Sequence, residues 1–136
     1  MYEIFEHTAD FGIRARSADL EGLFADAAHA LFSLMVANLD GVSPVDEMSF
    51  EIDGDQPDEL LHDWLAELLY TFCTRRLVFK EFEIKRTPSG ISAIARGEPL
   101  NTARHEIDVE VKAITWHALK VEQTADGWLA EVIVDV

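Results

Sequence analysis

Hydrophobic residues recur at helical spacing in two segments of the chain. After Ser17, a candidate N-cap, apolar residues follow at spacings of three and four as far as Asn38. A second stripe begins after Pro57, which suits the first position of a helix, and extends to Phe72. The pattern predicts two long amphipathic helices, whose apolar stripes are Leu20, Leu23, Phe24, Ala27, Ala28, Leu31, Phe32 and Met35, and then Leu61, Trp64, Leu65, Leu68, Leu69 and Phe72.

Elsewhere apolar and polar residues alternate, which is the pattern of half-buried strands. Together with two turn signals, Thr87-Pro88-Ser89-Gly90 and Asp126-Gly127, this pattern predicts two hairpins. The predicted strands cover residues 2–5, 11–16, 48–52, 78–85, 91–96, 106–111, 119–123 and 128–134. These elements predict an α+β fold in one domain over residues 1–136. Two amphipathic helices are expected to pack on a mixed, mostly antiparallel sheet as a two-layer sandwich.

The net charge of the chain indicates which kinds of partner it can bind. Asp and Glu number 26 against 11 Lys and Arg, and the formal net charge is −15. A protein that binds nucleic acid over a broad face needs Lys and Arg opposite the phosphates, so strong direct binding of nucleic acid is not expected. An acidic surface instead suits a basic protein partner or cations.

Cysteine content and hydropathy bear on the compartment. Cys73 is the only cysteine and cannot form an internal disulfide, which favours the reducing cytoplasm. Its position beside Phe72 in an apolar helical run predicts a small core residue and not a nucleophile. We find no run of about 18 apolar residues that would predict a transmembrane helix, and residues 1–6 do not resemble a signal peptide. A cytoplasmic protein without membrane attachment is expected, and its oligomeric state stays open.

Common nucleotide-binding and hydrolase motifs are missing from the sequence, which has no Walker loop, GxGxxG, GxSxG or HExxH. A polar segment, His7-Thr8-Ala9-Asp10, lies between two predicted strands, where Thr8 and Asp10 could simply cap local backbone amides. A second polar cluster interrupts the alternation of the later strands and contains Lys112, Thr115 and His117. The other histidines, which have no comparable polar neighbours and are predicted to be structural or surface residues, are His29, His62 and His105.

The third cluster lies at the end of the sequence, where the predicted core strand 128–134 runs directly into Asp135 and Val136. Ordered backbone would hold the Asp135 carboxylate near the terminal carboxylate of Val136, and close carboxylates repel unless a cation or donor lies between them. Asp10 would add a third carboxylate if the first and last strands are neighbours. This all-oxygen set suits a hard cation such as Ca²⁺, Mg²⁺ or Mn²⁺, and not Zn²⁺.

Taken together, these segments resemble the archease family over essentially the whole chain. Residues 7–12 look like its HTAD-x-G signature, and residues 112–117 are similar to its K-A-[VI]-T-[YW]-H segment. Residues 20–28 and 64–70 look like its first and second helices, and Gly127-Trp128 with the run into Asp135 looks like its ending. Each motif alone is modestly specific, but all of them in this order are highly specific.

The resemblance implies an accessory and non-enzymatic role. Archeases assist the RtcB-type RNA ligase, which joins RNA ends in tRNA splicing and RNA repair, by promoting guanylylation and multiple turnover of the ligase. The family binds a divalent metal, described as Ca²⁺, at positions that correspond here to Asp10, Asp135 and Val136. These three positions form the acidic tip of the predicted fold. The candidates for supporting this tip or contacting the partner are His7, Lys112, Thr115 and His117.

Two other functions stay open at this point. One is a small metal-dependent phosphoester hydrolase, in which His7 or His117 acts as general base beside the metal. The other is a metal-free, chaperone-like interaction module, which would bind its partner through a broad apolar patch.

Overall fold

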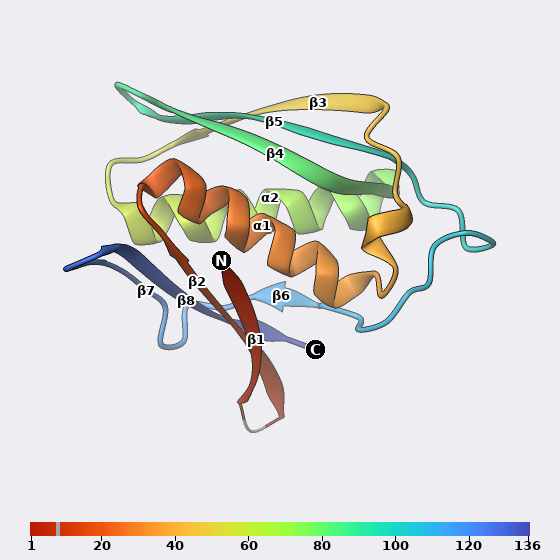
Figure 1. Cartoon of the computed structure of the whole chain (residues 1–136), viewed down its shortest axis with the longest axis horizontal. Helices are drawn as coiled ribbons and strands as arrows, with labels where there is room; N and C mark the ends of the chain where they lie inside the picture. The colour runs from red at the N-terminus through yellow and green to blue at the C-terminus, as the bar shows by residue number, and fades with distance from the viewer. Residues whose placement is uncertain (8) are drawn as a thin grey trace.

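Two helices lie between two sheets in the computed structural model, which describes residues 1–7 and 9–136 (Figure 1). The helices are α1 (Leu20–Met35) and α2 (Pro57–Arg75), and a short 3-10 helix, η1, covers Leu39–Gly41. The larger sheet contains β1 (Tyr2–His7), β2 (Asp10–Ser17), β6 (Ala113–Ile114), β7 (Lys120–Thr124) and β8 (Gly127–Asp135). The smaller sheet contains β3 (Asp46–Asp53), β4 (Leu77–Thr87) and β5 (Gly90–Pro99). The predicted α+β class is confirmed.

The structure adds a second sheet to the predicted arrangement. In the larger sheet the order is β1-β2-β8, with β6 and β7 both paired to the other side of β8, whereas the smaller sheet has the order β3-β5-β4. Every strand pair among the described residues is antiparallel. Since α1 is buried nearly all the way round, it needs cover on more than one side, and it contacts β2 in one sheet and β4 in the other.

The ends of α1 differ from the sequence prediction. The N-cap is Asp19, whose side chain accepts a hydrogen bond from the Gly22 amide at 2.7 Å, and Ser17 instead ends β2 opposite Trp128. The helix stops at Met35 and not near Asn38, because Val36 is extended and forms a bridge with Ile107. Both ends are therefore determined by pairing with distant segments.

The alternating run 106–111 is not a sheet strand, so that prediction was wrong. Its amides bond to the end of α1 and to the residues that follow it. Asp108 N–H donates to Met35 O at 2.9 Å beside the bridge of Ile107 to Val36, Val109 N–H donates to Leu34 O at 3.2 Å, and Glu106 N–H donates to Asn38 Oδ1 at 2.7 Å. The last carbonyls of a helix have no partner inside the helix, and this segment supplies one. Packing against a helix end thus produces the same alternation as packing in a sheet.

Helix α2 begins at Pro57, as predicted, and its buried side chains follow the predicted stripe. Cys73 was predicted to be a core residue, but it is exposed, because it lies beyond the last buried turn of this stripe.

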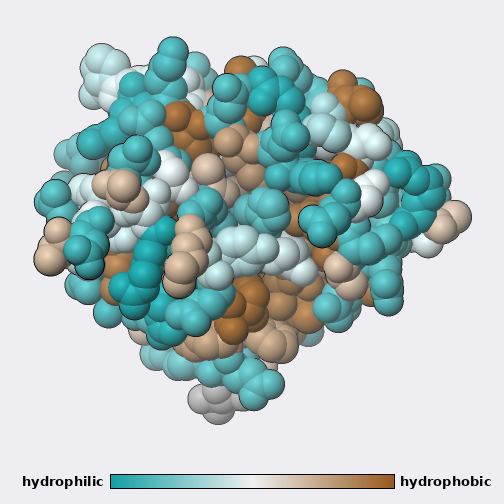
Figure 2. Space-filling view, viewed as in Figure 1, coloured by the Kyte–Doolittle hydropathy of each residue, from teal (hydrophilic) through white to brown (hydrophobic). Residues whose placement is uncertain are grey.

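No helix in residues 1–7 and 9–136 is long and apolar enough to cross a membrane. Figure 2 shows a mostly hydrophilic face, with hydrophobic residues gathered below α1 and beside β1.

A buried carboxylate joins the end of β5 to the loop after η1. Glu98, which is 7% exposed, accepts hydrogen bonds from the Ser43 amide at 2.6 Å and from Arg104 Nη1 at 2.7 Å. His105 Nε2 lies 3.2 Å from the same carboxylate, and its Nδ1 accepts a hydrogen bond from the Asn101 amide. The proton of His105 is therefore on Nε2, where it is donated to Glu98. The bonds from Arg104, Ser43 and His105 lower the pKa of Glu98 from 4.5 to about 2.

Glu98→Gln is expected to weaken the fold at neutral pH and to make little difference in acid. The folded-state pKa lies below the unfolded value, so the stabilisation is complete above about pH 4.5 and is lost as the pH falls towards about 2. Urea unfolding at a series of pH values tests this, with the exposed Glu81→Gln as the control. If the free energies of unfolding of wild type and Glu98→Gln differ by the same amount at pH 7 and at pH 3, the stabilising role of this carboxylate is contradicted.

Candidate functional site

Strand register brings the predicted acidic residues to one end of the larger sheet. In the β1–β2 hairpin, His7 pairs with Asp10. The described pairing of β2 with β8 ends at Phe11 opposite Val134, so the next residue along each strand, Asp10 and Asp135, occupy facing positions. The first and last segments, whose proximity the sequence left open, are therefore neighbours in the fold, and Figure 1 shows the end of β8 beside the hairpin.

The faces of these strands place the two carboxylates on the same side. Ile13 and Ala15 of β2 and Val132 and Val134 of β8 belong to the core beneath the helices. Because side chains alternate along a strand, Asp10 and Asp135 project from the opposite, outer face, as does His7 through its pairing with Asp10. A single row across the outer face therefore contains His7, Asp10, Asp135 and Ala113.

Gly12, the glycine of the HTAD-x-G signature, has a steric role in the next row. A Cβ atom at Gly12 would lie 2.1 Å from Cζ of Phe5, so the Phe5 ring lies directly over this residue. The guanidinium of Arg14 covers the same ring, with Cζ 4.6 Å from the ring centroid. A side chain at position 12 would displace this ring, which lies in the row next to that of His7 and Asp10.

The 112–117 segment completes the site from the other side of β8. Lys112 N–H donates to Asp135 O at 2.7 Å, and Thr115 donates to Ile133 O through both its amide, at 3.0 Å, and its hydroxyl, at 2.9 Å. The rings of His117 and His7 lie 5.4 Å apart between centroids. The structure thus brings together all the predicted supporting residues, namely His7, Lys112, Thr115 and His117.

Asp10 and Asp135 differ from the charged residues farther along the same face. There Arg14 bonds to Glu3 at 2.8 Å and to Glu131 at 2.6 Å, and Lys120 lies 3.0 Å from Glu131. Burial would raise the pKa of Glu131, but the bonds from Lys120 and Arg14 together lower it. By contrast, no ion pair in the described part of the chain includes Asp10 or Asp135.

The donors at this end of the sheet set limits on a metal site. Among the described residues, no three side chains of His, Cys, Asp or Glu lie close enough together to hold a metal ion. A site formed by Asp10 and Asp135 would therefore need main-chain oxygens, such as those of Val136, whose side chain packs against the core. Nδ1 of His7 is buried and has no hydrogen-bond partner among the described residues. The suggested capping role of Thr8 lies outside the described residues.

A contact between α2 and the 112–117 segment was not predicted from the sequence. His62, predicted to be a structural or surface residue, stacks on Trp116 with ring centroids 3.7 Å apart. Its Nε2 lies 3.1 Å from Ile114 O, next to the residue that pairs with Asp135. The periodicity of α2 leaves His62 at the margin of the apolar stripe, but it does not indicate which segment His62 contacts.

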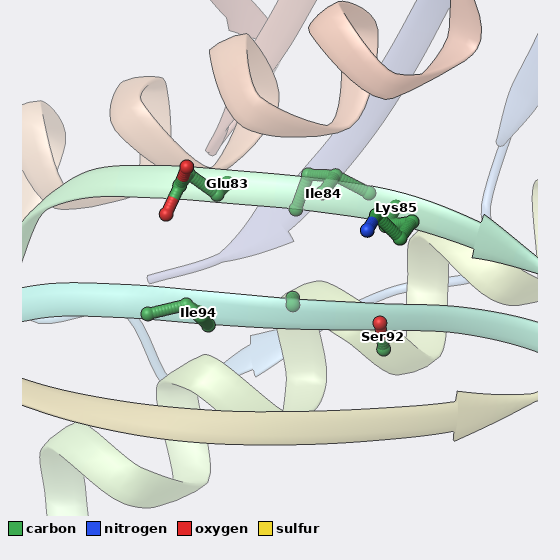
Figure 3. A pocket seen from close by; sticks show the side chains of 6 residues that line it. Glu83, Ile84, Lys85, Ser92 and Ile94 are labelled. Carbon is green, nitrogen blue, oxygen red and sulfur yellow. The ribbon is translucent and has the colours of Figure 1, made fainter.

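A separate hollow of about 240 Å³ lies on the smaller sheet (Figure 3). Its lining comes from β4 and β5 and consists of Glu83, Ile84, Lys85, Ser92, Ala93 and Ile94. These strands belong to the other sheet from Asp10 and Asp135, so the hollow is not part of the candidate site.

Comparison with known proteins gives the same family over nearly the whole length. Residues 2–136 match the model of the Archease protein family (MTH1598/TM1083). The protein archease of Methanopyrus kandleri is 40% identical over 139 residues, with 99% of both chains covered. That of Pyrococcus abyssi is also 40% identical, over 140 residues, with 99% of this chain and 98% of the relative covered.

Two solved structures have the same fold. The solution structure of protein 1598 of Methanobacterium thermoautotrophicum matches with a TM-score of 0.87 and 34% identity, over 99% of this chain and 98% of that one. The crystal structure of an archease and possible chaperone from Thermotoga maritima matches with a TM-score of 0.69 over 100% of this chain and 98% of that one. At 20% identity, this second likeness concerns the fold alone.

Proposed function

Because this chain belongs to the archease family, we propose that it is an accessory protein that activates an RtcB-type RNA ligase in RNA repair or tRNA splicing. It raises guanylylation of the ligase and its number of turnovers, and it does not itself join RNA. The observation that carries this proposal is the row of His7, Asp10 and Asp135 at one end of the larger sheet, beside the 112–117 segment. In a chain without a nucleotide-binding or hydrolase motif, this acidic tip is the polar site that contains the family's signature segments.

The tip would hold one divalent cation through the carboxylates of Asp10 and Asp135 and main-chain oxygen of Val136. Three observations support this fit: the two carboxylates face each other across β2 and β8, neither is ion-paired among the described residues, and Nδ1 of His7 beside them is buried without a partner there. Close carboxylates without a donor between them are stabilised by a cation. Oxygen donors suit Ca²⁺ first, with Mg²⁺ and Mn²⁺ as the other candidates.

The partner's active-site cleft is the expected docking place for this tip. A ligase that binds RNA has a basic cleft, and the net charge of −15 on this chain is complementary to it. A cation held by Asp10 and Asp135 would supply positive charge that could offset the negative charge of phosphate oxygens. The chain's own contribution is to hold Asp10 and Asp135 on paired strands, so that the tip enters the cleft as a rigid unit.

Ligation with a limiting amount of an RtcB-type ligase tests the proposal directly. With this protein present, ligated RNA should exceed one product per ligase molecule, and the guanylylated ligase should form faster. Equal turnover with and without the protein would contradict activation. If turnover is equal but the protein prevents aggregation of heated ligase, the chaperone-like alternative is favoured. Phosphoester hydrolysis by the protein alone, lost in Asp10→Ala, would favour the hydrolase alternative.

A further inference from the structure

An exposed tryptophan is held rigidly beside the acidic tip. Trp116 is 56% exposed, and one face of its indole stacks on the His62 ring at a centroid distance of 3.7 Å and an interplanar angle of 15°. The His62 ring is itself fixed, because Nε2 lies 3.1 Å from Ile114 O and Nδ1 lies 3.0 Å from Oδ1 of Asp63. The indole is thus oriented by α2, while the rest of its surface is open.

The backbone around Trp116 also keeps it outward. The hydroxyl of Thr115 accepts a hydrogen bond from the His117 amide at 3.2 Å, and Leu119 N–H donates to Trp116 O at 3.4 Å. Ala118 has φ of 52°, in the left-handed region that non-glycine residues disfavour. A large aromatic side chain that a strained turn presents to solvent is a candidate binding contact, because tryptophan is enriched among the residues that dominate protein interfaces.

The helix on which this indole stacks carries mainly acidic charge. On α2, residues 57–74 contain no Lys or Arg, and the exposed acidic residues of this stretch are Asp58, Glu59, Asp63 and Glu67. Asp63, bonded to the ring under Trp116, is 51% exposed at its side chain and uses only one carboxylate oxygen in the hydrogen bonds of the described residues. An aromatic face beside carboxylates is the environment that a guanidinium group prefers, because the group stacks on the ring and pairs with the carboxylate.

We propose that Trp116, His62 and Asp63 form a receptor for an arginine side chain of the partner protein. Trp116 contacts the guanidinium, Asp63 pairs with it, and His62 positions both. That the partner is the ligase rests on the proposed function, whereas the preference for arginine rests on the three side chains alone. A nucleobase could also stack on the indole, but its phosphates would lie against the acidic face of α2 and be repelled.

The first test uses the protein alone and does not depend on the ligase. In NMR spectra, the indole N–H signal of Trp116 is identified by its loss in Trp116→Tyr, and N-acetyl-arginine amide and N-acetyl-lysine amide are titrated separately. The arginine probe should move this signal several-fold more than the lysine probe, and it should leave the signal of buried Trp64 unchanged. Equal responses to both probes, no response, or a response to a uridine oligonucleotide alone would overturn the inference.

The second test asks whether the partner uses this receptor. Trp116→Ala should raise the concentration needed for half-maximal ligase activation by about tenfold or more, as for a central aromatic contact. Trp116→Tyr should restore most of the affinity, and added arginine should compete with wild type more than lysine does at equal ionic strength. Tyr70→Ala is the matched control, since Tyr70 is an aromatic on α2 that is 64% exposed.

The results separate the two proposals. If wild type leaves ligase turnover unchanged while the NMR preference for arginine holds, the proposed function fails and the receptor stands. If wild type activates and Trp116→Ala activates at the same concentration, the receptor's role in docking is overturned and the proposed function stands. Circular dichroism of each variant checks that the exposed substitution has not altered the fold.

Discussion

Asp10→Asn and Asp135→Asn are each expected to lower ligase activation by about tenfold to a hundredfold or more. Loss of a group that only supports a metal ligand already costs about tenfold to a hundredfold in metal affinity or activity. Both substitutions keep the size of the side chain and remove one charge from the pair that faces across β2 and β8. Loss of either charge leaves too few anionic oxygens to hold a divalent cation. The affinity for Ca²⁺, measured by calorimetry, should fall together with activation.

The fold should survive these changes. Asp135 is exposed and Asp10 is half-buried, and surface substitutions usually alter the free energy of unfolding by less than about 0.5 kcal/mol. Without metal, removing one of two neighbouring carboxylates relieves repulsion, so the melting temperature should stay equal or rise. With Ca²⁺, wild type should gain thermal stability and the variants should not.

The matched control for the acidic pair is Asp46→Asn, which removes the same charge at the exposed start of β3 in the other sheet. It should leave both Ca²⁺ affinity and activation at the wild-type level. Full activation by Asp10→Asn and Asp135→Asn would contradict the proposed role of the tip. A tag fused after Val136 tests the end separately, since full activity of the tagged protein would exclude a free terminal carboxylate as a required ligand.

Trp64→Ala is expected to lower the free energy of unfolding by about 3–5 kcal/mol, the usual cost of truncating a large buried aromatic residue. Trp64 of α2 is 0% exposed, and its Nε1 donates to Phe24 O of α1 at 3.1 Å. Its ring packs edge-on against Phe50 of β3 at 5.5 Å and Phe82 of β4 at 6.2 Å. One side chain therefore connects the two helices with the smaller sheet.

Urea unfolding with Trp116→Ala as the control gives the cleanest comparison. Both variants lose an indole. Trp116→Ala should lower the free energy of unfolding by less than about 1 kcal/mol, because an exposed side chain loses little buried area. Since domains of this kind are stable by about 5–15 kcal/mol, the buried substitution should shift the midpoint strongly. Similar losses in the two variants would contradict the central position of Trp64 in the core.

Local chemistry allowed some elements to be predicted closely. Pro57 begins α2 because its missing N–H and fixed φ suit the first helical turn whatever surrounds it. The Asp126-Gly127 turn joins β7 to β8 because Gly127 adopts a φ of 141°, which side chains disfavour. The apolar stripes of both helices were also correct, since burial follows directly from their periodicity.

The errors have a common cause, which is pairing between distant segments. Ser17 resembles an N-cap, yet it pairs with Trp128 and so remains in β2. The 106–111 run alternates like a strand, yet its amides bond to the end of α1. Cys73 follows an apolar stripe that is covered only as far as the preceding turn. In each case the local pattern is compatible with two partners, and long-range packing selects one.

For the candidate site too, residue types could be predicted from the sequence, whereas their positions depend on contacts between distant segments. The sequence already indicated three polar clusters, namely the turn with Asp10 between two strands, Asp135 directly after a core strand, and the 112–117 segment that interrupts an alternating run. Their common location depends on the register of β2 with β8. A slip of one residue in this register would turn the side chains of one strand to the other face of the sheet. The stack of His62 on Trp116 depends likewise on how α2 packs against the strands, and periodicity within a helix carries no information about that partner. Composition and periodicity thus identify which residues can act, and strand register and helix packing bring them together, because contacts between distant segments form only when the whole core is assembled.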